Sequence, residues 1–280
     1  MILIIWNWRI FYYQCFPDWK ILWISEWILF EFIIILLITI GFGAGLLGAL
    51  IGVGGGIIMT PALAFLGFPP YVIASSSLLA VTATSLSSTI TYIKKKYINY
   101  SLGLKLALPA IPGSIIGSFL SKDVSLDSFK IYFAVLLITV GIYILFKDRM
   151  IYTANFHIPK YMFYPLFVIG TFTAGIISSF FGVGGGIIFV PILVIIFEMK
   201  MINASPTSQF TLLLSSATGL GTHIILEHPE YFLGIALASG SFLGAQVGSK
   251  YLHAFKENLL RKIFSVALIV VACSLVLSLV

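Results

Sequence analysis

GVGGGIIMTP occupies residues 52–61, and GVGGGIIFVP repeats it at residues 182–191. A helix cannot continue through such a glycine run without cost, because each interior glycine loses about 1 kcal/mol relative to alanine. Apolar residues and then a proline follow each run, which predicts that a short new helix begins at the glycines. A helix break that occurs twice is therefore the feature that decides the fold.

The composition around these breaks is that of a membrane protein. Apolar residues make up 60% of the 280 residues and charged residues 9%, whereas a soluble domain carries about a quarter charged residues. Long apolar runs at 32–40, 131–146 and 263–280 suit helices that cross the hydrocarbon core. The short alternating segments of a β-barrel are not seen. We expect an all-α integral membrane protein with the lipid bilayer as its solvent.

The similarity between the two halves extends beyond the glycines. The offset is 130 at the breaks (182 minus 52) and 131 further on (207 minus 76), so that Ser76-Ser77 matches Thr207-Ser208. A register kept over about a hundred residues indicates an internal duplication. We therefore predict two homologous repeats.

Each repeat reads as about five helical pieces, one of which is short and broken by glycines. These pieces lie at 32–51, 55–67, 71–93, 101–121 and 127–147, and again at 163–181, 185–198, 205–226, 231–250 and 259–280. All five tryptophans precede the first piece, which is typical of a segment at the membrane–water boundary. The predicted domains are an aromatic interfacial leader (1–31), a first transmembrane repeat (32–147), a polar linker (148–162) and a second transmembrane repeat (163–280).

The lysine and arginine residues predict how the repeats face the membrane. If each short piece crosses, one side holds Arg9, Lys20, Lys122 and Lys130, and the other holds the remaining 12 of 16 (16 minus 4). If the short piece turns back, the split is 9 to 7. Because cytoplasmic loops are enriched in lysine and arginine, the first arrangement is favoured, and it gives the two repeats inverted topology.

Unwound glycine backbone inside a membrane is tolerated where protein or a watery cavity surrounds it. A helix that begins there presents free N–H groups and the positive end of its dipole, which suit an anion. We predict that Pro61 and Pro191 shape the half-helices and that the substrate meets Gly54, Gly55, Gly56, Gly184, Gly185 and Gly186. Glycines can instead permit close helix packing, the interpretation we favour for Gly41, Gly45, Gly48, Gly113, Gly117, Gly244 and Gly248.

A hydroxyl-rich helix follows each break. Neutral hydroxyl and amide donors can replace the water around an oxyanion without trapping it by full charge. The candidates in register are Ser76, Ser77, Thr207, Ser208 and Gln209. The alternative is that these side chains satisfy backbone carbonyls and pack neighbouring helices.

Few ionisable groups lie inside the predicted spans. His223 matches Tyr92 in the first repeat and is a candidate proton relay, although its position near Glu227 and His228 also fits a boundary residue. The sequence contains no catalytic Ser-His-Asp or Cys-His set and no metal-ligand spacing, so we expect no enzyme, metal site or cofactor. Basic residues lie in short loops rather than on one soluble face, which argues against nucleic acid as a partner.

The paired Gly-x-Gly-Gly-Gly-x-x-x-x-Pro runs, each followed by a serine- and threonine-rich helix, resemble the sulfite exporter TauE/SafE family. The resemblance covers about residues 35–280 and both repeats. It implies transport of sulfite or organosulfonates across a prokaryotic plasma membrane by a multi-pass protein. The family is usually described with eight or so spans, whereas the charge count here favours ten helical pieces.

We therefore expect a secondary membrane permease that moves small anions by alternating access, with its site between the two repeats. A passive anion channel and a permease for another small solute stay open as alternatives. No ATPase motif is present, so a substrate gradient, an unidentified coupling ion or another protein would have to supply the energy. The oligomeric state is left open.

Overall fold

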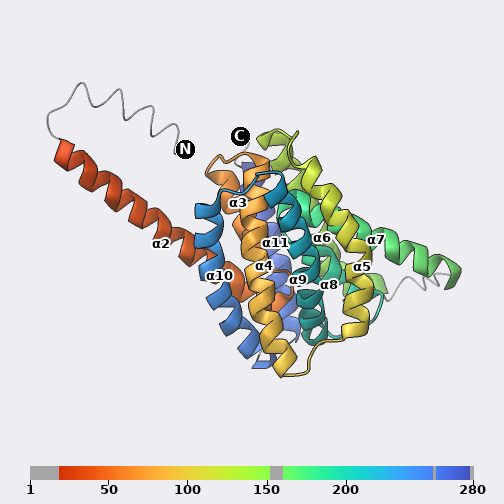
Figure 1. The fold of residues 1–280 in the computed structure, drawn as a ribbon. Coiled ribbons are helices and arrows are strands. Elements are labelled where there is room, and N and C mark those ends of the chain that lie inside the picture. The colour runs from red at the N-terminus through yellow and green to blue at the C-terminus, as the bar shows by residue number, and fades with distance from the viewer. Residues whose placement is uncertain (1–18, 152–159, 255–256, 278–280) are drawn as a thin grey trace. The chain divides into compact units, whose positions relative to one another are not determined.

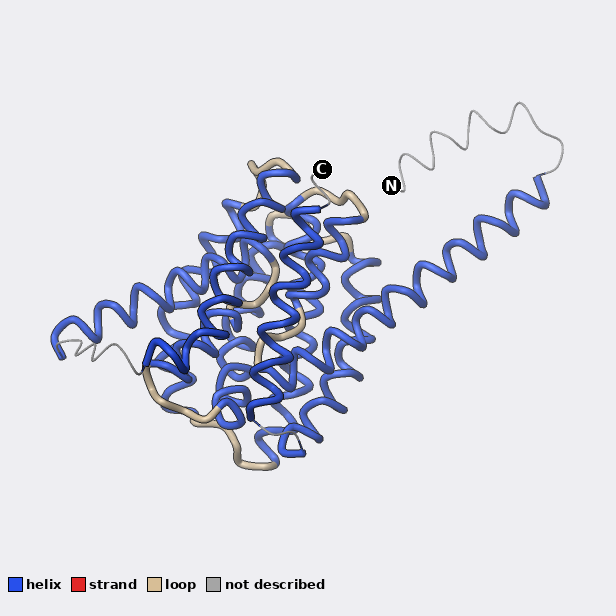
Figure 2. Tube along the Cα trace, turned by 180° about the vertical axis from the view of Figure 1, so that it is seen from behind, coloured by secondary structure: helices blue, strands red, loops and turns tan. Residues whose placement is uncertain are grey.

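The computed structural model describes residues 19–151, 160–254 and 257–277, which consist of helices joined by short loops, without a strand (Figure 2). The prediction of an all-α chain is confirmed for these residues. Part of the predicted leader, residues 1–18, and part of the predicted linker, residues 152–159, lie outside them.

The helices fall close to the predicted pieces. In chain order they are α2 (Trp19–Ile51), α3 (Gly56–Phe65), α4 (Pro70–Lys94), α5 (Tyr100–Leu120), α6 (Leu126–Ile151), α7 (Lys160–Phe181), α8 (Gly186–Ile195), α9 (Met201–Ile225), α10 (Tyr231–Tyr251), the 3-10 helix η1 (Leu252–Ala254) and α11 (Glu257–Leu277).

Several boundaries differ from the expectation by three residues or more, and two of them shorten the predicted linker: α6 ends at Ile151 rather than at 147, and α7 begins at Lys160 rather than at 163. Helix α2 begins at Trp19 rather than at residue 32, because no glycine or proline interrupts residues 19–40. Helix α8 ends at Ile195 rather than at 198. Helix α9 begins at Met201 rather than at 205, so that Pro206 is its sixth residue and the Ile202 carbonyl lacks its usual helical N–H partner.

Four described segments are long and apolar enough to cross a membrane. They are Glu31–Ile51, Pro70–Lys94, Tyr100–Leu120 and Tyr231–Tyr251. Helices α3 and α8 have only 10 residues each. At 1.5 Å per residue each is about 15 Å long, half of a hydrocarbon core of about 30 Å. Neither can span the membrane alone.

The chain divides into two compact units, Met1–Leu37 and Ile38–Val280. The second unit contains both glycine breaks. In it α4 packs on α10 and α9, α5 packs on α7 and α9, and α6 packs on α11 (Figure 1). In the sequence register α9 matches α4 and α10 matches α5, so the α4–α10 and α5–α9 contacts join corresponding pairs of helices. The repeats and their opposite orientation in the membrane stay predictions.

Glycines at helix contacts let two backbones approach each other. A β-carbon built on Gly113 or Gly117 in α5 would overlap the backbone of Phe172 or Ile176 in α7. Similar close contacts join residues 38–51 of α2 to α10. They involve Gly41, Gly45, Gly244 and Gly248. The close-packing prediction is confirmed for these six glycines.

Candidate substrate site

Each break is a short unwound segment between two helices. Helix α2 ends at Ile51 and α3 begins at Gly56, and α7 ends at Phe181 and α8 begins at Gly186. Three glycines in each break have positive φ, with values of 91°, 82° and 82° in the first break and 71°, 85° and 62° in the second. A residue with a side chain would be strained there, which explains why both breaks need glycine. The positions are Gly52, Gly54 and Gly55, and Gly182, Gly184 and Gly185.

The two breaks face each other. A β-carbon built on Gly186 would lie 2.6 Å from the Gly52 oxygen and 2.6 Å from the Val53 Cα. One built on Gly56 would meet the backbone of Val183 and Gly182 in the same way. The start of each half-helix therefore contacts the backbone of the opposite break.

Two apolar side chains cover the meeting point of the breaks. Val81 of α4 and Leu212 of α9 both lie against Gly54 and Gly184. All four residues are buried or nearly so. In the described conformation the glycines of both breaks are therefore buried beneath these two side chains.

Several N–H groups at the breaks have no acceptor within the described part of the chain. Ile58 and Met59 donate to the Gly55 carbonyl, but no side chain caps either half-helix. The groups left without a partner belong to Gly55, Gly56, Ile57, Gly185 and Ile187. Buried backbone donors are nearly always bonded, so these five are available to a ligand or to water.

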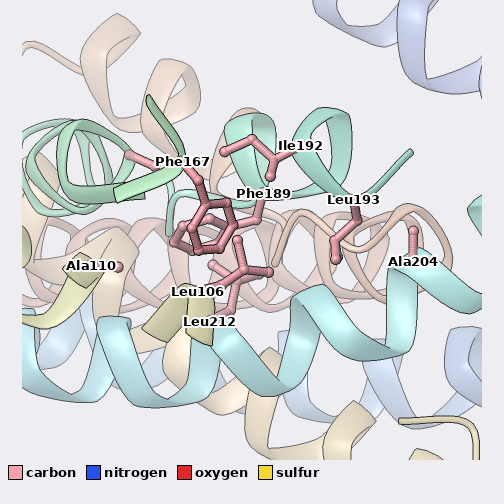
Figure 3. Packing of buried hydrophobic residues seen from close by; sticks show 9 residues of the cluster. Leu106, Ala110, Phe167, Phe189, Ile192, Leu193, Ala204 and Leu212 are labelled. Atoms are coloured by element: carbon pink, nitrogen blue, oxygen red, sulfur yellow. The ribbon is translucent and has the colours of Figure 1, made fainter. Parts of the chain in front are cut away.

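Helix α8 is held by a cluster of apolar side chains (Figure 3). Phe189, Ile192 and Leu193 of α8 pack with Leu106 of α5 and Leu212 of α9. Figure 3 shows the side chains of Phe189 and Phe167 close together above Leu106 and Leu212. Leu212 therefore belongs both to the core that positions α8 and to the cover over the breaks.

The predicted donors of α9 point at the first break. Ser208 Oγ donates to the Gly52 carbonyl at 2.6 Å, and Gln209 Nε2 donates to the Gly48 carbonyl at 2.7 Å. Ser205, which the sequence interpretation missed, donates to the Ala49 carbonyl at 2.9 Å. In this conformation these side chains satisfy carbonyls at the end of α2, and only Gln209 keeps a free polar atom, Oε1.

Of the remaining hydroxyl candidates, two form hydrogen bonds with loop residues and one has no hydrogen-bond partner. Ser76 donates to the Glu230 carbonyl at 3.4 Å, and Thr207 accepts from the Asn99 N–H at 3.1 Å. Both therefore tie helix starts to loops. Ser77 is fully buried and its Oγ has no hydrogen-bond partner. The role of all five candidates in substrate binding stays a prediction.

The prolines lie inside the half-helices, as predicted. Pro61 is the sixth residue of α3 and Pro191 the sixth of α8. Each lacks the N–H that would bond the carbonyl four residues earlier, at Ile57 or Ile187. Each proline therefore leaves a carbonyl near the break without its helical partner.

His223 and its counterpart Tyr92 make equivalent contacts. Tyr92 donates its hydroxyl to the Ala49 carbonyl at 2.9 Å, and His223 Nε2 lies 3.1 Å from the Ser179 oxygen. Ala49 and Ser179 correspond across the repeat (179 minus 49 is 130). His223 Nδ1 also lies 2.9 Å from Nδ1 of His228, a partner that the sequence interpretation did not assign.

Among the described residues, no three His, Cys, Asp or Glu side chains come close enough to hold a metal ion. The expectation of no metal or cofactor stays a prediction. The chemistry of the breaks is that of uncharged N–H and O–H donors, because residues 41–61 and 171–191 contain no charged side chain.

The family model described as Sulfite exporter TauE/SafE matches residues 37–275, which include both breaks. The chain belongs to this family. Its members are membrane transporters rather than enzymes, and the multi-pass membrane architecture agrees with that.

Curated relatives support the assignment. The chain is 31% identical to the "Probable membrane transporter protein YunE" of Bacillus subtilis over 86% of this chain and 97% of the relative. It is 30% identical to a "Probable membrane transporter protein" of Methanocaldococcus jannaschii over 75% and 80% of the two chains. The "Probable membrane transporter protein YfcA" of Escherichia coli is 25% identical over 83% and 85%. No solved structure gives a significant match.

Proposed function

We propose that this member of the family is a secondary permease for small oxyanions, with sulfite and organosulfonates as its substrates, in the plasma membrane of a prokaryote. The observation that carries the proposal is the facing pair of half-helix starts, each of which has backbone N–H groups without a partner in the described chain. Oriented N–H groups at the positive ends of two helices stabilise an anion without a lysine or arginine.

The substrate class follows from the chemistry of the donors. Sulfite and sulfonates present three oxygens around one sulfur, and each oxygen accepts hydrogen bonds. The unpartnered N–H groups come from the starts of both half-helices, so that different oxygens of one group can be bound at once. They belong to Gly55, Gly56 and Ile57 in the first break and to Gly185 and Ile187 in the second. Uncharged donors bind weakly enough to permit release on the other side.

Movement of the two side chains that cover the breaks is the conformational step that we assign to the transport cycle. Val81 and Leu212 belong to α4 and α9, the hydroxyl-rich helices of the two halves. Rocking one half against the other would move one of these side chains away from the glycines while the other stays in place. The site would then open to one side of the membrane at a time, as alternating access requires.

Counterflow of labelled sulfite or methanesulfonate in proteoliposomes tests the proposal. A left-handed backbone conformation costs a non-glycine residue about 1–2 kcal/mol. We therefore expect Gly185→Ala, with φ of 62°, to reduce counterflow by about tenfold. Gly221→Ala is the matched control, because a β-carbon there meets no atom within 4 Å.

Three results would contradict the proposal. Unchanged counterflow in correctly inserted Gly185→Ala would remove the break from the site. No counterflow of either anion by the wild-type protein would exclude this substrate class. A flux that does not saturate and carries the full ionic current would favour a passive channel.

A further inference from the structure

The loops that follow α4 and α9 have the same backbone but different chemistry. The Tyr97 N–H donates to the Tyr92 carbonyl, and the His228 N–H donates to the His223 carbonyl, both at 3.1 Å. The residue before each is in the left-handed region, with φ of 57° at Lys96 and 58° at Glu227. The first half thus places two tyrosines where the second half places two histidines.

The hydrogen-bond partners of His223 determine where its proton lies. The Ser179 carbonyl can only accept, so Nε2 of His223 carries a hydrogen and donates to it. In the neutral pair Nδ1 of His223 is then an acceptor, and Nδ1 of His228 donates to it across 2.9 Å. Nε2 of His228 is left with a lone pair that can take another proton.

The surroundings of the pair disfavour positive charge. His223 is fully buried, and His228 is 5% exposed. Tyr71 of α4 packs on His228 with ring centroids 5.2 Å apart. Burial lowers the pKa of His228, and the Lys122 ammonium in the loop after α5 lowers it further. The charged neighbours along the chain are Glu227 and Glu230, both exposed.

We propose that the His223–His228 pair is a proton-binding site and that its proton is the coupling ion of anion transport. A proton from the aqueous side binds Nε2 of His228. The hydrogen on Nδ1 of His228 then moves to Nδ1 of His223, which becomes an imidazolium. In this transfer the N–H bond at Nδ1 of His228 breaks and an N–H bond at Nδ1 of His223 forms. The net change for the pair is the one proton gained at Nε2 of His228.

The site is connected to the second glycine break through the Ser179 carbonyl. Ser179 lies in the last turn of α7, and the carbonyl of its neighbour Ser178 accepts from the N–H of Val183 at 3.1 Å and of Gly184 at 3.4 Å. An imidazolium donates a stronger hydrogen bond than a neutral imidazole. Protonation of His223 therefore strengthens its hydrogen bond to the Ser179 carbonyl in the last turn of α7. Because the described conformation disfavours the charged pair, a bound proton shifts the population toward another conformation.

Charge balance favours movement of the proton in the same direction as the anion. One proton and one monovalent anion together carry no net charge, which lowers the cost of carrying the anion through a low-dielectric region. In the predicted orientation Lys122 belongs to the external side, so His228 would receive its proton from outside. This inference rests on the proposed anion transport.

The test uses methanesulfonate in proteoliposomes, because this anion does not itself bind protons in the range measured. Counterflow without a pH gradient measures anion exchange, and accumulation driven by an outside-acid gradient measures proton coupling. With one proton per anion, one pH unit supports about tenfold accumulation in the wild-type protein. The loss of accumulation in a variant that still shows counterflow is the expected sign of uncoupling.

His223→Tyr is the first variant, because Tyr92 shows that tyrosine can donate to the corresponding carbonyl. We expect it to keep counterflow and lose accumulation. Tyr92→Phe is the matched control: it removes a carbonyl donor from the first half, and its ratio of accumulation to counterflow should equal that of the wild type. If His223→Tyr does not insert, His228→Asn replaces it, with the same expectation.

Accumulation by His223→Tyr or His228→Asn equal to that of the wild type would overturn the proton site. A wild-type protein that exchanges methanesulfonate but does not accumulate it in response to the pH gradient would also overturn the proton site. That result would leave the proposed permease function unaffected. A readout independent of transport is scalar coupling between the two Nδ1 nuclei in protein with nitrogen-15-labelled histidine. The wild type should show it and His228→Asn should not, and its absence in the wild type would also contradict the site.

Discussion

The two glycine breaks have nearly the same sequence but different support. At the first break, α9 donates to three carbonyls near the end of α2, through Ser205, Ser208 and Gln209. At the second break, the matching positions of α4 hold Ala74, Ser77 and Leu78. Of these only Ser77 carries a hydroxyl, and it has no hydrogen-bond partner.

The second break depends on different contacts. Thr60 of α3 donates to the Phe181 carbonyl at 3.0 Å, and His223 donates to the Ser179 carbonyl. The hydroxyls of Ser178 and Ser179 are buried without a partner. A buried polar group without a hydrogen bond costs about 1–3 kcal/mol. We infer that the first break is the better satisfied of the two and that the second rearranges at lower cost.

The largest expected effect concerns the orientation of the two halves. Lys96 and Glu227 occupy matching positions, and both are exposed. After replacement of Cys15 and Cys273, Lys96→Cys should react with a membrane-impermeant thiol reagent only from the cytoplasmic side. Glu227→Cys should react only from outside, because the repeats are predicted to be inverted. Reaction of both from the same side would show that the halves are parallel.

The next largest effect concerns the contribution to stability of the matching serines at the two breaks, Ser208 and Ser77. Ser208→Ala removes a buried donor to the Gly52 carbonyl, and we expect it to lower the free energy of unfolding by about 1–3 kcal/mol. Ser77→Ala at the matching position removes a hydroxyl without a partner and should be neutral or stabilising. Unfolding of the purified protein in mixed micelles measures both. Equal losses would contradict the difference drawn between the breaks.

The smallest effect is on stability at acid pH. The pKa of His228 is lowered by burial and by Lys122, so the unfolded chain binds a proton more readily than the folded one. Stability should fall as the pH drops below about 6.5, the usual histidine value. His228→Asn should have a shallower acid limb than the wild type in thermal unfolding, whereas Tyr97→Phe, at the matching position, should not. Identical acid limbs for wild type and His228→Asn would contradict this assignment.

Much of the fold could be predicted because it depends on local patterns. Apolar runs and glycine punctuation located the helices to within a few residues, and α3 and α8 began at the predicted glycines. The start of α2 was missed because an aromatic segment without breakers can be a helix as readily as an interfacial coil. The contact of His228 with His223 was missed because a loop histidine is not distinctive, although its register with Tyr97 could have indicated it.

The sequence by itself determined the membrane as solvent, the two breaks, and the need for glycine there, because hydrophobicity and backbone sterics are properties of the residues. Only the tertiary structure decided what each polar side chain bonds. Ser208 and Ser77 look equivalent in the sequence, yet one donates to a carbonyl and the other does not. A hydrogen bond depends on positions accurate to a fraction of an ångström between residues about 150 apart in the chain, and no local pattern specifies them.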